Sequence, residues 1–239
     1  MLSYFLDIIF PPVCPLCRVM VMDGILCPKC RGKLLSKRIT PPFCALCGIP
    51  FIAYGCDRAN IPTRLCGSCI TEKKPFKEAR SAFAYEGAIV DAIHRFKYNG
   101  AVELAGYLGR LASDGTEFSA RPDVVVPVPL HKKRLRRRGF NQSLLLAREA
   151  AKKFSVKVDC LNLKRVRDTD AQANLKLKER EDNIKGAFAV TDGKAFGNKT
   201  VLLVDDVFTT GATIRECART LERAGAEVQV LTLARTLIN

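Results

Sequence analysis

The segment 201–213, VLLVDDVFTTGAT, places two kinds of polar chemistry directly after an apolar run. Two aspartates end that run, and a short loop rich in threonine and glycine follows. Backbone N–H groups at the start of a helix suit a phosphate, as do threonine hydroxyls, and Gly211 lets the backbone approach it closely. The two carboxylates suit vicinal hydroxyls and the water shell of Mg²⁺. The segment therefore predicts a site for a sugar phosphate that carries a diol, and a solvated strand end is the alternative. The candidate catalytic residues are Asp205 and Asp206, and the candidate phosphate-binding residues are Thr209, Thr210, Gly211, Ala212 and Thr213.

Cysteines supply a second candidate chemistry, because eight of the eleven form four CxxC pairs: CPLC, CPKC, CALC and CGSC. Two such pairs can complete a tetrahedral shell of four sulfur ligands, which is the geometry of structural zinc. Pairs that are neighbours in the sequence predict two zinc centres, whereas interleaved pairing and iron–sulfur clusters are the alternatives. The reducing cytoplasm, where we expect the protein to act, favours metal over disulfides. The expected ligands are Cys14, Cys17, Cys27 and Cys30 for one ion, and Cys44, Cys47, Cys66 and Cys69 for the other.

The charge of the chain favours an anionic partner. Among 239 residues there are 39 Lys and Arg but 24 Asp and Glu, which gives a formal net charge of +15. Such a balance is typical of proteins that bind nucleic acid or phosphorylated small molecules. Six basic residues and no acid lie between 132 and 138, and a solvated basic loop is the alternative interpretation of that run. No apolar run approaches the roughly 20 residues of a membrane-spanning helix, so we expect no membrane span.

The distribution of cysteines divides the chain into two expected units. Residues 1–75 predict a double zinc-ribbon module with a short N-terminal helix, and residues 80–239 predict an α/β domain. Within the α/β domain, apolar strand patterns alternate with helical patterns, which predicts a mostly parallel sheet with helices on both faces. Strands are expected over 79–87, 122–130, 156–166, 187–193, 198–207 and 226–236, and helices over 88–100, 102–112, 141–154 and 212–225. Ligands bind beyond the carboxyl ends of such strands, where the loops 127–142 and 205–213 are expected to lie.

The segment VLLVDDVFTTGAT resembles the phosphoribosyl pyrophosphate (PRPP) loop of type I phosphoribosyltransferases. Three further segments narrow the resemblance: FKYNG at 96–100, PVPLHKKRLRRRGFNQ at 127–142 and RDTDAQANLKLKEREDNIKGAF at 167–188. Behind the paired CxxC motifs, they resemble the ComF/GntX family of competence-associated proteins along nearly the whole chain. The resemblance implies a type I phosphoribosyltransferase-like parallel sheet flanked by helices, preceded by a double zinc-ribbon module.

The resemblance also implies roles for particular residues. The loop from Thr209 to Thr213 would wrap the 5′-phosphate of PRPP, and the two aspartates would meet the 2′- and 3′-hydroxyls of the ribose. The loop after VVVPVPL matches the pyrophosphate loop, so its candidates to face the diphosphate are His131, Lys132 and Arg134. The segment 167–183 corresponds to the mobile loop over the active site.

Three functions follow from these observations. The favoured one is cytoplasmic handling of incoming single-stranded DNA in natural transformation, with a site that binds Mg²⁺-PRPP or a related ribose 5-phosphate ligand. The second is an active phosphoribosyltransferase that acts on a nucleobase or another nitrogen nucleophile. The third is a non-catalytic zinc-ribbon adaptor for a DNA-processing partner such as a helicase or recombination mediator.

Overall fold

The computed structural model describes residues 11–51, 64–98, 101–169 and 182–237. The expected N-terminal helix therefore lies outside the described residues, as does most of the segment 167–183. Within the described ranges, no helix combines the length and the apolar character that crossing a bilayer requires.

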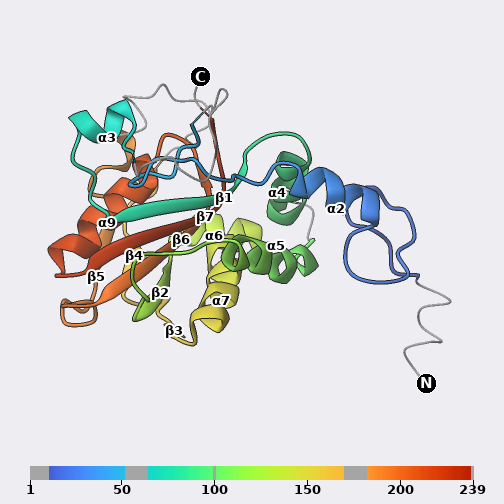
Figure 1. Cartoon of the computed structure of the whole chain (residues 1–239). Helices are drawn as coiled ribbons and strands as arrows, with labels where there is room; N and C mark the ends of the chain where they lie inside the picture. The colour runs from blue at the N-terminus through green and yellow to red at the C-terminus, as the bar shows by residue number, and fades with distance from the viewer. Residues whose placement is uncertain (1–10, 52–63, 99–100, 170–181, 238–239) are drawn as a thin grey trace.

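A parallel sheet of five strands forms the centre of the molecule, as the sequence predicts (Figure 1). Its order is β1-β7-β6-β2-β3, and every neighbouring pair is parallel. Because all strands run the same way, the loops that follow β2 and β6 meet at one edge of the sheet. The strands are β1 (Glu78–Ala84), β2 (Val124–Pro127), β3 (Lys157–Val158), β6 (Thr200–Phe208) and β7 (Glu227–Arg235).

Helices cover both faces of the sheet, and the side chains of β6 alternate between them. Leu202 and Val204 pack with α4, α5 and α7, whereas Val201 and Leu203 pack with α9. This two-sided burial explains why β6 is apolar along most of its length rather than alternating. Figure 1 shows α9 on one side of the sheet and the other three helices on the opposite side. The helices are α4 (Ala88–Tyr98), α5 (Glu103–Asp114), α7 (Gln142–Phe154) and α9 (Ala212–Arg223).

Two predicted elements differ from the structure. The single strand expected over 156–166 is wrong, because it divides into β3 and β4 (Leu163–Arg165), and β4 pairs with β5 (Phe188–Val190) in a separate antiparallel sheet. The division occurs where Asp159 Oδ1 accepts hydrogen bonds from the N–H groups of Leu161 and Asn162, both at 2.9 Å. An aspartate that captures nearby N–H groups in this way favours a turn over a strand.

The predicted loop after β2 also contains a helix, α6 (Lys132–Arg138). It ends at Gly139, which has φ 82° and donates its N–H to Leu135 O at 2.8 Å. Glycine adopts this left-handed conformation without steric cost, which makes it a common helix terminator. The basic run of the sequence is therefore displayed on a short helix rather than on an irregular loop.

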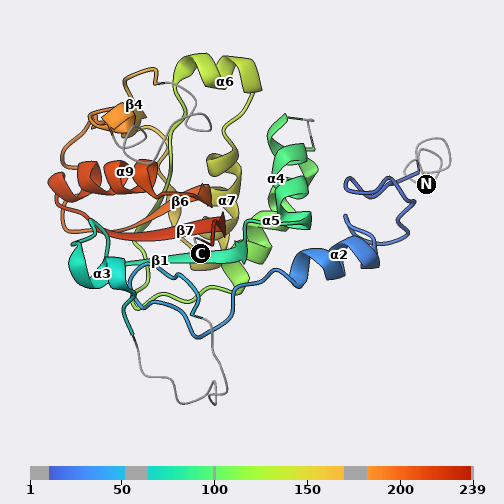
Figure 2. The same cartoon turned by 90° about the horizontal axis from the view of Figure 1, so that it is seen from above.

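The two cysteine groups attach to the sheet domain at different places (Figure 2). The first, with α2 (Pro28–Leu35), packs beside α4, where Arg95 Nη1 donates to Pro15 O at 2.9 Å. The second, with α3 (Gly67–Thr71), lies against β1, where Ala79 N donates to Leu46 O at 2.7 Å.

The chain between the two groups runs along the outer edge of β1. Arg38 and Phe83 form an antiparallel bridge, supported by hydrogen bonds from Ile39 N to Ala82 O at 2.9 Å and from Ala84 N to Lys37 O at 2.8 Å.

Candidate ligand pocket and metal centres

A pocket of about 410 Å³ opens at the carboxyl ends of β2 and β6. It lies where the order of the sheet places the two loops expected to bind ligand. Both predicted acids and most of the predicted phosphate loop line it, together with basic side chains from α4, α6 and β4. The residues of interest in its wall are Lys97, Tyr98, Arg134, Arg138, Ser143, Arg165, Asp205, Asp206, Thr209, Gly211, Ala212 and Thr213.

The two aspartates are buried at the base of this pocket, where Asp205 is 8% and Asp206 5% exposed. Ser143 Oγ donates to Asp205 Oδ1 at 2.8 Å, and the N–H of Asp206 donates to the same oxygen at 2.9 Å. Burial, reinforced by the charge of Asp206, raises the pKa of Asp205 to about 7. The pair is thus a buried acidic site in which Asp205 titrates near neutral pH.

Lys97, near the end of α4, supplies the compensating charge. Its Nζ forms an ion pair with Asp206 Oδ2, and the Lys97 side chain is 18% exposed. Burial opposes the charge of Lys97, but the attraction of Asp206 outweighs it and raises the pKa of the lysine. A buried carboxylate pair is costly without such a partner, because two like charges in a low dielectric repel strongly.

The loop after β6 has the geometry that the sequence predicts for an anion site. Gly211, at φ 76°, precedes the first residue of α9, so the N-terminal turn of that helix opens onto the pocket. A Cβ on Gly211 would lie 2.6 Å from two carbons of the Phe208 ring, so any other residue here would have to displace that ring. Thr210 is the exception among the predicted loop residues, because it does not line the pocket; its carbonyl accepts a hydrogen bond from Arg215 Nη1 at 2.7 Å.

Two arginines, Arg134 of α6 and Arg165 of β4, also line the pocket. Arg134 Nη2 donates to Thr169 O at 2.7 Å, and Arg165 Nη2 donates to the hydroxyl of Thr169. Burial, followed by repulsion from Arg134, lowers the pKa of Arg165. Among the described residues, neither arginine forms an ion pair with a carboxylate. Two guanidinium groups held close together without an ion-paired carboxylate are suited to bind an anion.

The other predicted diphosphate ligands lie elsewhere. His131 Nδ1 lies 3.2 Å from Asp168 Oδ1, and Lys132 lines a neighbouring apolar groove with Leu135 and Phe140. The structure therefore brings only Arg134 of the three into the pocket that holds the aspartate pair.

Five of these pocket residues were missed by the sequence reasoning: Lys97, Tyr98, Arg138, Ser143 and Arg165. Lys97 belongs to the FKYNG segment that supports the resemblance, and this was a signal that could have suggested a role for it. Ser143 lies two residues after Asn141, the N-cap of α7, so the start of that helix beneath the pocket was also foreseeable.

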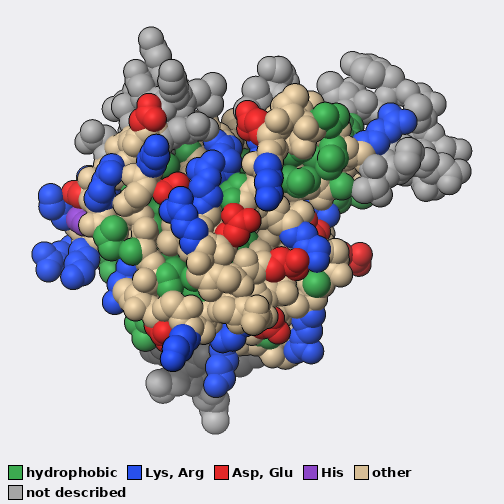
Figure 3. Space-filling model, turned by 90° about the vertical axis from the view of Figure 1, so that its left-hand side faces the viewer, with side chains coloured by type: hydrophobic (Ala, Val, Ile, Leu, Met, Phe, Trp, Pro, Cys, Tyr) green, Lys and Arg blue, Asp and Glu red, His purple; other side chains and the backbone are tan. Residues whose placement is uncertain are grey.

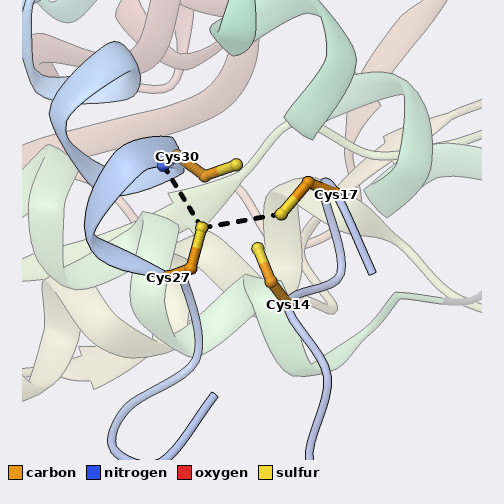
Figure 4. A group of neighbouring side chains, drawn as sticks. All are labelled: Cys14, Cys17, Cys27 and Cys30. Atoms are coloured by element: carbon orange, nitrogen blue, oxygen red, sulfur yellow. Dashed lines mark hydrogen bonds between the residues drawn. The ribbon is translucent and has the colours of Figure 1, made fainter. Parts of the chain in front are cut away.

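The cysteines form two compact groups in the neighbouring-pair arrangement that the sequence predicts. In each group, all four sulfur atoms lie within 4.8 Å of one another. Cys17 and Cys27 Sγ are 3.5 Å apart, and Cys47 and Cys66 Sγ are 3.6 Å apart. A tetrahedral zinc with Zn–S bonds of about 2.3 Å separates its sulfurs by roughly 3.8 Å. Figure 4 shows the sulfurs of the first group pointing toward a common centre, so both groups fit a zinc ion.

Each group also contains one thiol that ionises easily. Burial opposes ionisation of Cys14 and Cys66, yet hydrogen bonds to their sulfurs outweigh it and lower the pKa of each to about 6. In the same groups burial and neighbouring sulfurs raise the pKa of Cys30, to about 12, and that of Cys69. A divalent cation displaces the thiol protons and binds all four sulfurs as thiolates, whose mutual repulsion it offsets. Metal binding therefore stabilises both groups.

The first CxxC turn is built in the same way in both groups. In each, the N–H of Cys14 or Cys44 donates at 2.8 Å to the carbonyl five residues later. The residue after the second cysteine has a positive φ: 64° at Arg18 and 70° at Gly48. A Cβ at Gly48 would collide with the carbonyl oxygen of Ala79, so only the second turn requires glycine, because it lies directly against β1.

Comparison with known families agrees with both halves of the structure. The double zinc ribbon domain matches residues 5–70, and the phosphoribosyl transferase domain matches residues 140–237. Among solved structures, the glutamine PRPP amidotransferase from B. subtilis is 23% identical, with a TM-score of 0.37 over 53% of this chain and 25% of that chain. That similarity is too low to add to the assignment.

Relatives match along most of the chain. The DNA utilization protein YhgH of Salmonella typhi is 33% identical over 236 residues, which are 95% of this chain and 98% of that protein. Competence protein F of Haemophilus influenzae is 31% identical, over 88% of this chain and 90% of that protein. Competence protein ComFC of Bacillus subtilis is also 31% identical, over 90% of this chain and 85% of that protein.

These matches confirm the expected fold class, a phosphoribosyltransferase-like parallel sheet with an N-terminal double zinc-ribbon module. With that architecture, and with relatives of this kind along nearly all of its length, the chain belongs to the ComF family of competence proteins.

Proposed function

We propose that the protein binds Mg²⁺-PRPP, or a related ribose 5-phosphate ligand, in the pocket at the carboxyl ends of β2 and β6. The observation that carries this proposal is one pocket with acids at its base and a helix N-terminus at its side. The 5′-phosphate lies against the loop from Thr209 to Thr213, where N–H groups and the helix dipole favour an anion. Asp205 and Asp206 accept hydrogen bonds from the ribose hydroxyls and contact the water shell of the magnesium ion.

The arginines support a ligand with a second anionic group. Arg134 and Arg165 lie in the same pocket as the aspartates and form no ion pair with a carboxylate among the described residues. A diphosphate at C1 of the ribose satisfies both guanidinium groups, because arginine binds phosphate oxygens in a bidentate manner. The same pair favours phosphoribosyl transfer as a second candidate function, since stabilising the departing diphosphate is the main electrostatic task of that reaction.

We further propose that the protein handles incoming single-stranded DNA in the cytoplasm, with α6 contributing to the contact surface. Lys132, Lys133, Arg136 and Arg137 are exposed, and α6 contains neither an acidic nor a buried residue. Over most of the face drawn in Figure 3, Lys and Arg side chains are interspersed with Asp and Glu side chains. A helix that carries only positive charge suits the phosphates of a nucleic acid. The relatives named as DNA utilization and competence proteins support this assignment.

Calorimetry with Mg²⁺-PRPP tests the ligand site. Asp205→Asn combined with Asp206→Asn removes both carboxylates but keeps their size, and we expect it to abolish measurable binding. The matched control is Asp91→Asn combined with Asp114→Asn, which removes two exposed acids from α4 and α5. Equal affinities for the wild type and the Asp205/Asp206 variant would overturn the assignment of the site.

Pyrophosphate release distinguishes binding from turnover. The wild type is incubated with Mg²⁺-PRPP and a panel of nucleobases and amines, and Arg134→Gln combined with Arg165→Gln serves as the variant. Release that depends on an acceptor and on these arginines identifies a transferase. Tight binding without release from any acceptor leaves the pocket as a ligand-sensing site.

A further inference from the structure

Arg235 connects the second cysteine group to the loop that opens onto the ligand pocket. It is the last residue of β7 and is 4% exposed. Its Nη1 donates a hydrogen bond to the carbonyl oxygen of Cys47, one of the four cysteines of the second group. Its guanidinium carbon also lies 5.0 Å from the centre of the Phe208 ring. One side chain thus contacts both a metal-ligand turn and the end of β6.

The ring of Phe208 in turn packs against the turn at Gly211. It is 6% exposed, and its carbonyl accepts a hydrogen bond from Thr236 N at 3.0 Å. Two of its ring carbons lie only 2.6 Å from the position that a Cβ on Gly211 would occupy. A displacement of the ring therefore removes the support on which the Gly211 turn and the start of α9 rest, because packed side chains transmit shifts directly.

The charge of Arg235 indicates why the second cysteine group matters to this contact. Among the described residues, no carboxylate forms an ion pair with Arg235, and its buried Nε has no hydrogen-bond partner. A buried cation is strongly destabilising unless an opposite charge lies close to it. Four thiolates around one Zn²⁺ carry a net charge of −2, and the carbonyl of Cys47 places that charge beside the guanidinium.

We propose that Arg235 is a positioning residue that couples metal occupancy of the second cysteine group to the geometry of the Gly211 turn. Loss of the metal to a chelator weakens the counter-charge beside Arg235 and thereby releases Phe208. The phosphate-binding loop then loses its preformed shape. In naming ligand binding as the property that is regulated, this proposal rests on the proposed function.

Arg80 provides a matched control within the same cysteine group. Its Nη1 donates to Ala45 O at 2.9 Å, and its guanidinium carbon lies 5.1 Å from the centre of the Phe43 ring. Arg80 therefore binds the same group through the same kind of contacts, but Phe43 precedes Cys44 and does not line the ligand pocket. Arg80 also has an acidic partner, because its Nη2 lies 2.8 Å from Glu78 Oε2.

Hydrogen–deuterium exchange in the zinc-loaded full chain, without ligand, tests the coupling directly. We expect Arg235→Gln to raise exchange at the amides of residues 208–214 by about tenfold, since the turn opens more often without its support. We expect Arg80→Gln to leave those amides unchanged. Equal exchange at 208–214 in the two variants would refute the proposal.

Metal variants provide the second measurement if Arg235→Gln folds poorly. Cys44→Ser removes a ligand of the second group, and Cys14→Ser removes the corresponding ligand of the first. Faster exchange at residues 208–214 in Cys44→Ser but not in Cys14→Ser supports the coupling. Unchanged exchange in Cys44→Ser, once its zinc content has fallen to one ion, contradicts it.

Calorimetry with ribose 5-phosphate separates this proposal from the proposed function. If the wild type binds the probe, we expect Arg235→Gln to bind it about tenfold more weakly and Arg80→Gln to bind it equally. If the wild type binds neither ribose 5-phosphate nor Mg²⁺-PRPP, the proposed ligand is wrong, and the exchange measurements still decide whether the coupling exists.

Discussion

Lys97 Nζ forms an ion pair with Asp206 Oδ2 across the floor of the pocket, and thereby connects the end of α4 to the end of β6. The pair is mostly buried, since the two side chains are 18% and 6% exposed. Its cation comes from the chain itself, so the acid pair is stabilised before any ligand or magnesium ion arrives.

Replacing Lys97 by methionine is expected to lower the free energy of unfolding by about 3 kcal/mol, because it strands a buried carboxylate. Lys37→Met is the control: its partner Glu86 lies 2.8 Å away, but the two side chains are 37% and 55% exposed. An exposed pair of this kind contributes at most about 1 kcal/mol. Urea denaturation measures both variants, and similar losses would show that Asp206 does not need Lys97.

The stability of the protein is expected to depend on pH through Asp205. Its pKa is raised from 3.8 to about 7, so the folded state holds a proton that the unfolded state releases between these values. The free energy of unfolding therefore falls as pH rises from about 4 to about 7, by up to about 1.4 kcal/mol per unit. Asp205→Asn should flatten this fall and make the protein more stable than the wild type at pH 8. Urea denaturation between pH 5 and pH 8 checks the prediction, and parallel curves for the two proteins would contradict it.

Gly211→Ala is expected to damage the ligand loop more than the same change at another left-handed glycine. Both Gly211 and Gly139 have positive φ values, 76° and 82°. At either position, a Cβ in that conformation destabilises the folded state by about 1–2 kcal/mol. Only at Gly211 would the Cβ also meet the ring of Phe208, because nothing lies within 4 Å of the site at Gly139. Thermal unfolding and PRPP calorimetry should both show the larger loss for Gly211→Ala. Identical losses would mean that the ring moves aside without consequence.

Single-stranded DNA binding should weaken when the exposed charge of α6 is reduced. Arg136→Gln combined with Arg137→Gln is expected to lower the slope of log affinity against log salt by about 1.4, or about 0.7 for each lost phosphate contact. The control, Lys194→Gln combined with Arg223→Gln, removes the same charge before β6 and at the end of α9. Both residues are exposed and lie toward the amino ends of the strands, away from the ligand pocket. Fluorescence anisotropy with a labelled oligonucleotide measures the slope. Equal slopes for the two double variants would exclude α6 as the contact surface.

The zinc content of the chain tests the cysteine groups. We expect two zinc ions per chain in the wild type and one in Cys30→Ser, because Cys30 completes the first group. Cys160→Ser should keep both ions, since Cys160 is exposed and belongs to neither group. Elemental analysis after gel filtration gives these ratios, and iron in place of zinc would favour the cluster alternative.

The sequence was most informative where local spacing alone determines the outcome. The CxxC spacing predicted which cysteines act as pairs, because two residues between ligands hold both sulfurs on one turn. It left open whether neighbouring or interleaved pairs share an ion, and the structure groups the neighbouring pairs. The glycine and threonine loop before α9 was predictable for the same reason: a helix start, a positive φ and the end of a buried strand are local features.

Partners that come from distant elements were not predictable in this way. The FKYNG segment suggests a role for Lys97 only by resemblance, and its residues alone do not indicate that the end of α4 packs over Asp206, which lies 109 positions later. The proximity of Arg134 and Arg165 likewise depends on how β4 folds away from the main sheet after Asp159. These contacts are set by tertiary packing, on which single-sequence patterns carry little information.

The path of residues 37–39 along β1 has a consequence for how the molecule meets other copies of itself. An outermost strand normally presents free N–H and C=O groups that can pair with a strand of another chain, which is a common start of aggregation. The contacts of Lys37, Ile39 and Leu46 occupy those groups on β1, while the opposite margin of the sheet is only two residues long. The zinc-ribbon module thus covers the exposed edge of β1 and blocks the pairing of a further strand there.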